Sequence, residues 1–249
     1  MLPKTIIKSA LRKAGFAIYA IPKGHFEARG GYTYAQAHPN ATLAPWLSDT
    51  EFMDAFERAK HNTLVDIYRL YDLWSLVAET AKAGGDIVEV GVWRGGSGCL
   101  MAKKAQLMGG DRTVWLCDTF KGVVKAGGAD SAYTGGEHRD TDERIVDDMA
   151  AQLGISNIRK LVGIFPDDSG PCLQAEKISL LHVDVDVYQS AKDCVNYLWE
   201  RMDSGAAIVF DDYGFVGCEG VTRCVDEFRN RQDMFFLHNL NGHAVLIKR

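Results

Sequence analysis

Short apolar runs alternate with segments of helical periodicity from residue 86 to residue 230. A run of about four to eight apolar residues followed by about ten residues of helical period is the pattern of strand–helix units in a parallel sheet. The predicted strands are Ile87–Val90, Val114–Cys117, Ile158–Val162, Ile178–Val183 and Ala206–Phe210. The predicted helices cover residues 97–108, 142–153, 190–202 and 219–230. This alternation predicts a doubly wound α/β sheet with helices on both faces.

The C-terminal end of the chain breaks this alternation. MFFLHN and AVLIKR are two apolar strands joined by LNGH, a connection typical of a β-hairpin. Five parallel strands that close in an antiparallel hairpin make a mostly parallel seven-stranded sheet. This is the pattern of the class I methyltransferase fold, which is Rossmann-like. A plain dinucleotide-binding fold would more often continue with parallel crossovers.

Another helical pattern precedes the first of these strands, and Gly84 and Gly85 end it. Its apolar residues recur at the spacing of one helix face and are Ile67, Leu70, Tyr71, Trp74 and Val77. We therefore expect two parts. Residues 1–83 form an N-terminal helical arm and segment that cover the cofactor and the substrate and contact other subunits. Residues 84–249 form the core that binds the cofactor.

The first 22 residues combine apolar positions with the basic side chains of Lys4, Lys8, Arg12 and Lys13. No small-residue cleavage site follows a clean apolar stretch, so the segment is a poor signal peptide. We expect it to pack on its own domain or on a sister subunit, which predicts a homo-oligomer. Contact with a membrane surface is the alternative interpretation.

The composition narrows the partners and the compartment. A chain of 249 residues suffices for one large α/β domain or for a core with an arm. The net charge of −5 and the lack of a basic cluster argue against nucleic acid as a partner. No apolar run reaches the roughly 18 residues of a transmembrane segment. The six cysteines form no C-x-x-C pair, which favours buried free thiols and a cytoplasmic location.

The segment Glu89–Ser97, EVGVWRGGS, begins at the end of the first strand of the core and continues into a glycine-rich turn. Gly91 permits a tight turn, and Gly95 and Gly96 let the backbone approach a ligand. The N–H groups at the start of the next helix can then bind a carboxylate or a phosphate. The spacing is E-x-G-x-x-x-G rather than G-x-G-x-x-G, and it suits S-adenosylmethionine better than NAD. A turn that is tight for structural reasons alone is the other interpretation.

Asp118 ends the next predicted strand, 29 residues after Glu89. A carboxylate at the tip of the second strand can accept hydrogen bonds from both ribose hydroxyls of a nucleoside cofactor. Helix caps also use Asp. The prediction that Asp118 binds ribose therefore depends on its interval from Glu89.

Four acidic residues follow the last two parallel strands, Asp184 and Asp186 after one and Asp211 and Asp212 after the other. Neighbouring strands lie ~4.8 Å apart, so carboxylates at adjacent strand tips can share one cation. Like charges at such a distance need a metal or a proton to neutralise them. All-oxygen ligands favour Mg²⁺, Mn²⁺ or Ca²⁺ over Zn²⁺. We predict that Asp184, Asp211 and Asp212 bind a metal, whereas Asp186 could equally cap a helix or face solvent.

Other polar residues give weaker signals. The glycine-rich segment Lys121–Arg139 is either a surface loop or a lid over the site. His138 and His182 could approach the substrate, although ordinary surface or core roles are the simpler interpretation. Trp93 and Tyr188 could wall a sugar or an adenine, and packing explains them equally well. The sequence contains no zinc-binding spacing, no G-x-S-x-G elbow and no P-loop.

From about Asn62 to Phe228 the chain resembles the macrocin O-methyltransferase family. Members of this family use S-adenosylmethionine and magnesium to methylate sugar hydroxyls of natural products. The matching blocks are NTLVDIYRLYDLW, DIVEVGVWRGGSGCLMA, VWLCDTFKG, GIFPD, HVDVDVYQSAKD and GAAIVFDDYG. The EVGVWRGG and DVDVYQS…DDYG blocks together are specific, because chance would rarely supply both in this order.

The resemblance implies a role for each site residue. The cofactor pocket would contain Glu89, Gly91, Trp93, Arg94, Ser97, Asp118, Thr119 and Phe120. The metal ligands would be Asp184, Asp211 and Asp212. The catalytic residues would be Asp184 and Asp186, with Asp186 as the candidate general base.

The chain also departs from the family pattern. It has GVVKAGG where the family usually has a Pro after its DSF-E-G-L block. Val185 stands where the family commonly has the Gly of D-G-D, and DDSG follows Phe165 and Pro166 instead of a T-L-P-like turn. These last two differences bear on the acceptor pocket and on the fit of the cofactor.

The implied reaction transfers a methyl group from S-adenosylmethionine to a sugar hydroxyl of a natural product or a surface glycan. Mg²⁺ or Mn²⁺ would lower the pKa of the hydroxyl, and Asp186 would remove its proton. A metal-dependent glycosyltransferase with a D-x-D motif is an alternative, but it leaves Glu89–Ser97 unexplained. The glycine spacing weakens an NAD-dependent oxidoreductase, and the carboxylate cluster disfavours a non-enzymatic nucleotide-binding protein.

Overall fold

The computed structural model describes residues 7, 11, 13–14, 28–35 and 41–249. The chain divides into two units, Met1–Gln36 and Ala37–Arg249. The described part of the first unit contains two short antiparallel strands, β1 (Ala28–Arg29) and β2 (Tyr32–Thr33). Most of the basic N-terminal segment lies outside the described residues, so its packing role stays a prediction.

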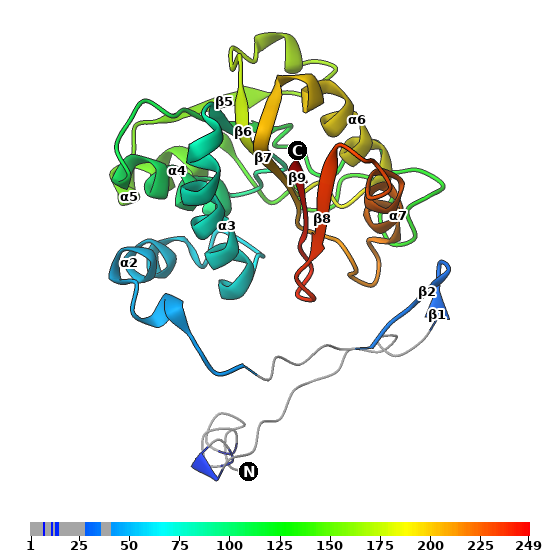
Figure 1. Cartoon of the computed structure of the whole chain (residues 1–249), viewed down its shortest axis with the longest axis horizontal. Coiled ribbons are helices and arrows are strands. Elements are labelled where there is room, and N and C mark those ends of the chain that lie inside the picture. Colours follow the sequence, from blue (N-terminus) through cyan, green and yellow to red (C-terminus); the bar gives the residue numbers. More distant parts are fainter. Residues whose placement is uncertain (1–6, 8–10, 12, 15–27, 36–40) are drawn as a thin grey trace. The chain divides into compact units, whose positions relative to one another are not determined.

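The second unit is built on a seven-stranded sheet with the order β5-β4-β3-β6-β7-β9-β8 (Figure 1). The first five of these strands are parallel, and β9 runs antiparallel to β7 and to β8. The predicted mostly parallel sheet with an antiparallel C-terminal hairpin is confirmed. The strands are β3 (Asp86–Val90), β4 (Val114–Asp118), β5 (Ile158–Val162), β6 (Ile178–Val183), β7 (Met202–Phe210), β8 (Met234–His238) and β9 (Ala244–Lys248).

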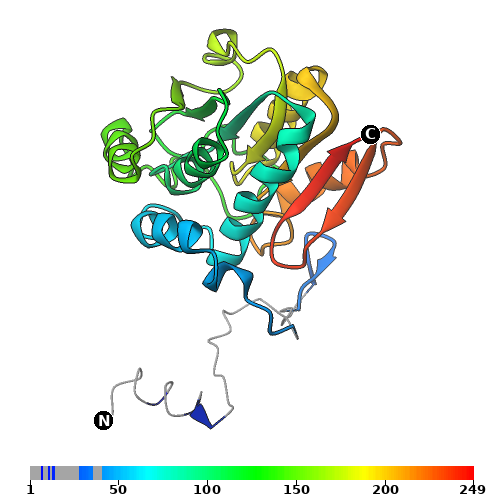
Figure 2. The same ribbon diagram turned by 60° about the vertical axis from the view of Figure 1, so that its left-hand side comes forward.

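Helices cover both faces of this sheet. Four of them share one core with one face, namely α2 (Thr50–Ala59), α3 (Ile67–Thr80), α4 (Gly96–Leu107) and α5 (Glu143–Leu153). The other face is covered by α6 (Tyr188–Leu198) and α7 (Glu219–Phe228). Figure 2 shows the hairpin of β8 and β9, in red, at one edge of the sheet. Short 3-10 helices are η1 (Pro45–Leu47), η2 (Ala81–Ala83), η3 (Gly170–Cys172) and η4 (Trp199–Arg201).

The central strands are apolar because helices cover them on both sides. Every residue of β6 is buried, and so is β3 from Ile87 to Val90. Such strands appear in a sequence as continuous apolar runs, which explains why they could be predicted. The strand β5 lies at the edge of the sheet and has a mixed pattern of half-buried and exposed residues.

Strand pairing brings the predicted site residues to one edge of the sheet. Val183 of β6 pairs with Phe210 of β7, so Asp184 and Asp211, the next residues, lie side by side. Val183 also pairs with Val90 of β3, which places the glycine turn after β3 beside Asp184. The carboxyl ends of parallel strands are where open α/β sheets bind ligands.

Two local features differ from the expectation. The strand β7 begins at Met202, inside the predicted helix 190–202 and four residues before the predicted strand. Its start was not predicted because its first residues, MDSG, form no apolar run. The helix α2 was not predicted, although Phe52, Ala55 and Ala59 are buried on it. The division of the chain after residue 83 stays a prediction.

The described helices include none with the length and apolar character of a membrane span. All six cysteines are free thiols. Five are buried as expected, and Cys172 is exposed.

Candidate active site

A cavity of about 320 Å³ opens where the carboxyl ends of the parallel strands meet. This volume is at the lower end of the range for small-molecule sites. Its walls come from the turn after β3, the tips of β4 and β5, the segments after β6 and β7, and the segment before α3. The cavity brings together the four predicted acidic residues Asp184, Asp186, Asp211 and Asp212.

The glycine turn brings the backbone after β3 against two other segments. Gly91 has a φ of +91°, and a Cβ at this position would lie 1.6 Å from the carbonyl oxygen of Asp184. A Cβ on Gly96 would lie 2.6 Å from the carbonyl oxygen of Asn62. Because only glycine permits these approaches, the turn can form one wall of the cavity beside the acidic cluster.

Asp118 at the tip of β4 holds this turn. Its Oδ2 accepts hydrogen bonds from the backbone N–H groups of Val92 at 2.7 Å and of Trp93 at 2.9 Å. Its Oδ1 accepts one from the N–H of Phe120 at 2.6 Å. A carboxylate offers about four lone-pair directions, so Asp118 keeps acceptor capacity toward the cavity that it lines.

The structure brings some of the predicted cofactor residues into the cavity and leaves others outside it. Those that line the cavity are Gly91, Trp93, Ser97, Asp118 and Thr119. Arg94 lies outside and forms an ion pair with Asp140 at 3.1 Å. Phe120 also lies outside and packs against the core. The cofactor-binding role of these residues stays a prediction.

Glu89 is fully buried beneath α4 and does not line the cavity. A Cβ on Gly98 of α4 would lie 2.2 Å from its Oε2. Its Oε1 lies 2.9 Å from Nδ1 of His182, which is also fully buried. His182 therefore has a core position, the simpler of the two interpretations of this residue. Although burial opposes its protonation, contacts with Asp211 and Glu89 raise the pKa of His182 to about 10.

The carboxylates of Asp184, Asp211 and Asp212 converge, and one oxygen of each lies within 4.8 Å of the others. Burial, together with the neighbouring carboxylates, raises the pKa of Asp184 and of Asp212 well above its usual range. Asp211 behaves differently. Burial opposes its ionisation, but the nearby His182 imidazole, a hydrogen bond from His243 and the charge of Arg69 lower its pKa.

This donor set suits a divalent cation. Its three carboxylates lie close enough to share one ion, and a cation would relieve the repulsion between them. The Arg69 guanidinium, ion-paired with Asp211, offsets part of their charge. Oxygen ligands are those that Mg²⁺ and Mn²⁺ prefer.

Asp186 has an unusual backbone conformation and close partners at the cavity wall. Its φ is +64°, and its N–H donates to Oδ2 of Asp212 at 3.1 Å. Its Oδ1 accepts a hydrogen bond from the hydroxyl of Tyr133 at 2.6 Å, and its Oδ2 lies 3.9 Å from Nε2 of His138. The carboxylate is thus held at the cavity rather than exposed to bulk solvent.

The segment Lys121–Arg139 forms part of the cavity wall. Its residues in the wall are Gly122, Val123, Val124, Tyr133 and His138. Backbone hydrogen bonds from the Val123 N–H to the Glu137 carbonyl and from the Gly136 N–H to the Val123 carbonyl, both 2.8 Å, join its two ends. Asp130 accepts from the N–H of Tyr188 at 2.9 Å and so caps α6, which has no cap of its own. These bonds fix the segment at the site, and its motion as a lid stays a prediction.

Sequence reasoning missed several residues of the site. Arg69 is buried on α3, where its charge interrupts the apolar face, and this interruption was a signal that could have found it. His243 stands in the hairpin connection LNGH and gave no signal of its own. Phe215 lines the cavity, and the Arg69 guanidinium lies 4.8 Å from its ring centroid. The ring of Tyr188 is not among the lining residues, and its hydroxyl donates to Glu227 at 2.9 Å.

Comparison with known proteins gives a consistent set of relatives. The family model described as Macrocin-O-methyltransferase (TylF) matches residues 51–248. Demethyldecarbamoylnovobiocin O-methyltransferase of Streptomyces niveus is 30% identical over 194 residues, which are 71% of each chain.

A third similarity names a glycosylated acceptor. The 8-demethyl-8-(2,3-dimethoxy-α-L-rhamnosyl)-tetracenomycin-C 4'-O-methyltransferase of Streptomyces olivaceus is 30% identical over 183 residues, 68% of each chain. Among solved structures, the O-methyltransferase NovP is 27% identical with a TM-score of 0.63. That similarity covers 76% of this chain and 82% of NovP.

Proposed function

The chain belongs to the macrocin O-methyltransferase family, and we propose that it transfers a methyl group from S-adenosylmethionine to a sugar hydroxyl. The acceptor belongs to a natural product or a surface glycan, and Mg²⁺ or Mn²⁺ assists the reaction. One observation carries this proposal, the position of the glycine turn directly against Asp184 in a cavity that also holds Asp211 and Asp212. A cofactor at the turn and a cation on the carboxylates would then be neighbours.

The residues of the chain divide the work. Asp118 accepts hydrogen bonds from the ribose, and Ser97, in the first turn of α4, lines the same cavity. Asp184, Asp211 and Asp212 would hold the divalent cation, which would supply Lewis acidity that lowers the pKa of the acceptor hydroxyl. Asp186, held by Tyr133, accepts the hydroxyl proton. S-adenosylmethionine bound beside the turn would supply the methyl group and leave as S-adenosylhomocysteine once its S–CH3 bond is broken.

Positioning accounts for much of the expected rate gain, because aligned reactants avoid the entropy cost of meeting. The relative from Streptomyces olivaceus supports a sugar acceptor, since its name specifies a rhamnosyl group. We also propose that the chain forms a homo-oligomer through its N-terminal segment, most of which lies outside the described residues.

A thermal-shift panel tests the proposed cofactor. The ligands are S-adenosylhomocysteine, a UDP-sugar and NAD, each with and without Mg²⁺. We expect stabilisation by S-adenosylhomocysteine, with a further increase when Mg²⁺ is added. Stabilisation by the UDP-sugar alone would overturn the proposal in favour of a glycosyltransferase.

Asp118→Asn should weaken the binding of S-adenosylhomocysteine by about 100-fold, because a hydrogen bond to a charged group contributes up to about 3 kcal/mol. The amide keeps the size of the side chain but removes its charge. Calorimetric titration measures the dissociation constant. Asp86→Asn is the matched control, since Asp86 also accepts from a backbone N–H, that of Thr113 at 2.9 Å, at the opposite end of the sheet. Equal affinity in Asp118→Asn and the native protein would contradict the ribose assignment.

A further inference from the structure

Three side chains surround the carboxylate of Asp211. Arg69 donates through Nη1 to its Oδ2 and to its main-chain carbonyl, the latter at 3.1 Å. His243 places Nε2 2.8 Å from its Oδ1. The Nε2 of His182 lies 3.5 Å from the same Oδ1, a charge contact longer than a hydrogen bond.

Each of these three side chains also contacts a second carboxylate. Arg69 donates through Nε to Asp66 at 2.9 Å. The Nδ1 of His182 lies 2.9 Å from Glu89, and the Nδ1 of His243 lies 3.6 Å from Oδ2 of Asp72. We call the set of Arg69, His182 and His243 the Asp211 cradle. Hydrogen bonds to Asp66 and Glu89 fix the orientation of Arg69 and His182, whereas the contact between His243 and Asp72 is longer than a hydrogen bond.

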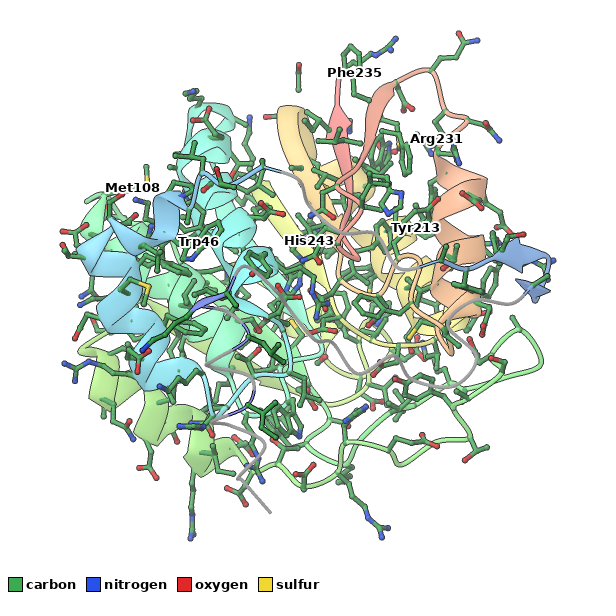
Figure 3. All side chains as sticks on the ribbon, turned by 90° about the horizontal axis from the view of Figure 1, so that it is seen from below. Trp46, Met108, Tyr213, Arg231, Phe235 and His243 are labelled. Carbon is green, nitrogen blue, oxygen red and sulfur yellow. The ribbon has the colours of Figure 1, made fainter. Side chains whose placement is uncertain are left out.

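The cradle member on the C-terminal hairpin is His243, which is fully buried. Figure 3 shows it in the middle of the view, whereas the labelled Phe235 and Met108 lie toward the periphery. The hairpin connection fixes its backbone, because its N–H donates to Oδ1 of Asn239 and its carbonyl accepts from the N–H of Asn239, both at 3.1 Å. This polar turn therefore positions a buried imidazole beside the acidic cluster.

The contacts of Asp211 leave it limited room for further partners. An ionised carboxylate has about four acceptor directions. Arg69 and His243 occupy two of them, and His182 faces a third. Because an ionised carboxylate can only accept hydrogen bonds, we infer that Nε2 of His243 carries the hydrogen and donates it to Oδ1 of Asp211.

We propose that the Asp211 cradle orients the carboxylate of Asp211 so that one acceptor direction stays free to bind a divalent cation. His243 is the positioning residue of this carboxylate. The inference rests on the proposed function, because it assumes that a cation binds to Asp184, Asp211 and Asp212. It adds a role for the hairpin connection LNGH, which the proposed reaction does not otherwise use. Outer partners of metal ligands typically change metal affinity by about 10–100-fold when they are removed.

Two variants of His243 test the proposal. Gln can place its amide nitrogen near the position of Nε2, whereas the shorter Asn reaches only the position of Nδ1. His243→Asn should therefore weaken Mg²⁺ or Mn²⁺ binding by about 10-fold or more, and His243→Gln should restore most of the affinity. Calorimetry measures the affinities of the native full chain and of both variants for Mn²⁺ and for S-adenosylhomocysteine.

Ser179→Ala is the matched control. Ser179 is fully buried on β6, the strand that carries His182, and it accepts a hydrogen bond from Arg112 at 2.6 Å away from the cavity. This variant should lower the melting temperature without changing the Mn²⁺ affinity.

Each result gives a clear answer. Weaker Mn²⁺ binding in His243→Asn, unchanged S-adenosylhomocysteine binding and recovery in His243→Gln support the positioning role. Native Mn²⁺ affinity in His243→Asn overturns it, and so does a parallel loss of both ligands, which would mean that His243 holds the fold instead. If the native chain binds S-adenosylhomocysteine but no Mn²⁺, the proposed function itself fails, and the variants are not needed to show it.

Discussion

Asp212→Asn should reduce methyl transfer by about 10³-fold or more. The substitution removes one of three converging carboxylates, and metal assistance contributes several kcal/mol to such reactions, each 1.36 kcal/mol being about tenfold in rate. Asn has nearly the same shape and retains an oxygen that can accept the N–H of Asp186. Release of S-adenosylhomocysteine with a glycosylated acceptor measures the rate.

Asp203→Asn is the control for this prediction, because Asp203 lies near the other end of β7 and forms an exposed ion pair with Lys177. It should keep the native rate. S-adenosylhomocysteine binding and the melting temperature of Asp212→Asn should also stay close to native values. Unchanged turnover in Asp212→Asn would contradict the metal-assisted mechanism.

Gly91→Ala should be the most destabilising single substitution at the site. A methyl group here meets the carbonyl oxygen of Asp184 at 1.6 Å, and the φ of +91° is unfavourable for any residue with a Cβ. Backbone strain of ~1–3 kcal/mol and overpacking of ~1–3 kcal/mol act together. We expect a loss of at least about 3 kcal/mol, which is about 6–12 °C in melting temperature for a domain of this size.

Gly128→Ala is the matched control for the turn. Gly128 has no heavy atom within 4 Å of a Cβ built on it, so the substitution meets no steric obstacle. It should leave the melting temperature unchanged or raise it slightly, because Ala has fewer unfolded conformations than Gly. A melting temperature of Gly91→Ala close to that of the native chain would refute the close approach between the turn and β6.

The sequence could predict the sheet because burial on both faces produces long apolar runs, as in β6. It could also predict the meeting of Asp184 with Asp211, since residues that follow adjacent parallel strands meet at one edge. The helix α2 was missed although Phe52, Ala55 and Ala59 stand at i, i+3 and i+7, the spacing of one helix face, so the sequence carried a signal for it.

The contacts behind the acidic cluster could not be predicted in the same way. Arg69 reaches Asp211 across 142 positions of sequence, and His243 reaches it from the next strand pair. Periodicity predicts which face of a helix or strand is apolar, but it does not predict which buried polar side chains contact each other. The same limit applies to Glu89, whose motif predicts a cofactor contact while the structure directs its carboxylate to His182.

Paramagnetic relaxation of S-adenosylmethionine labelled with ¹³C at its methyl group tests the central claim, that cofactor and cation share one cavity. The native protein is loaded with the labelled cofactor and then with Mn²⁺ or with Mg²⁺. We predict that Mn²⁺ strongly broadens the methyl signal, that Mg²⁺ does not, and that Asp212→Asn removes the broadening. A bound cofactor whose methyl signal is the same with Mn²⁺ and with Mg²⁺ would contradict the account.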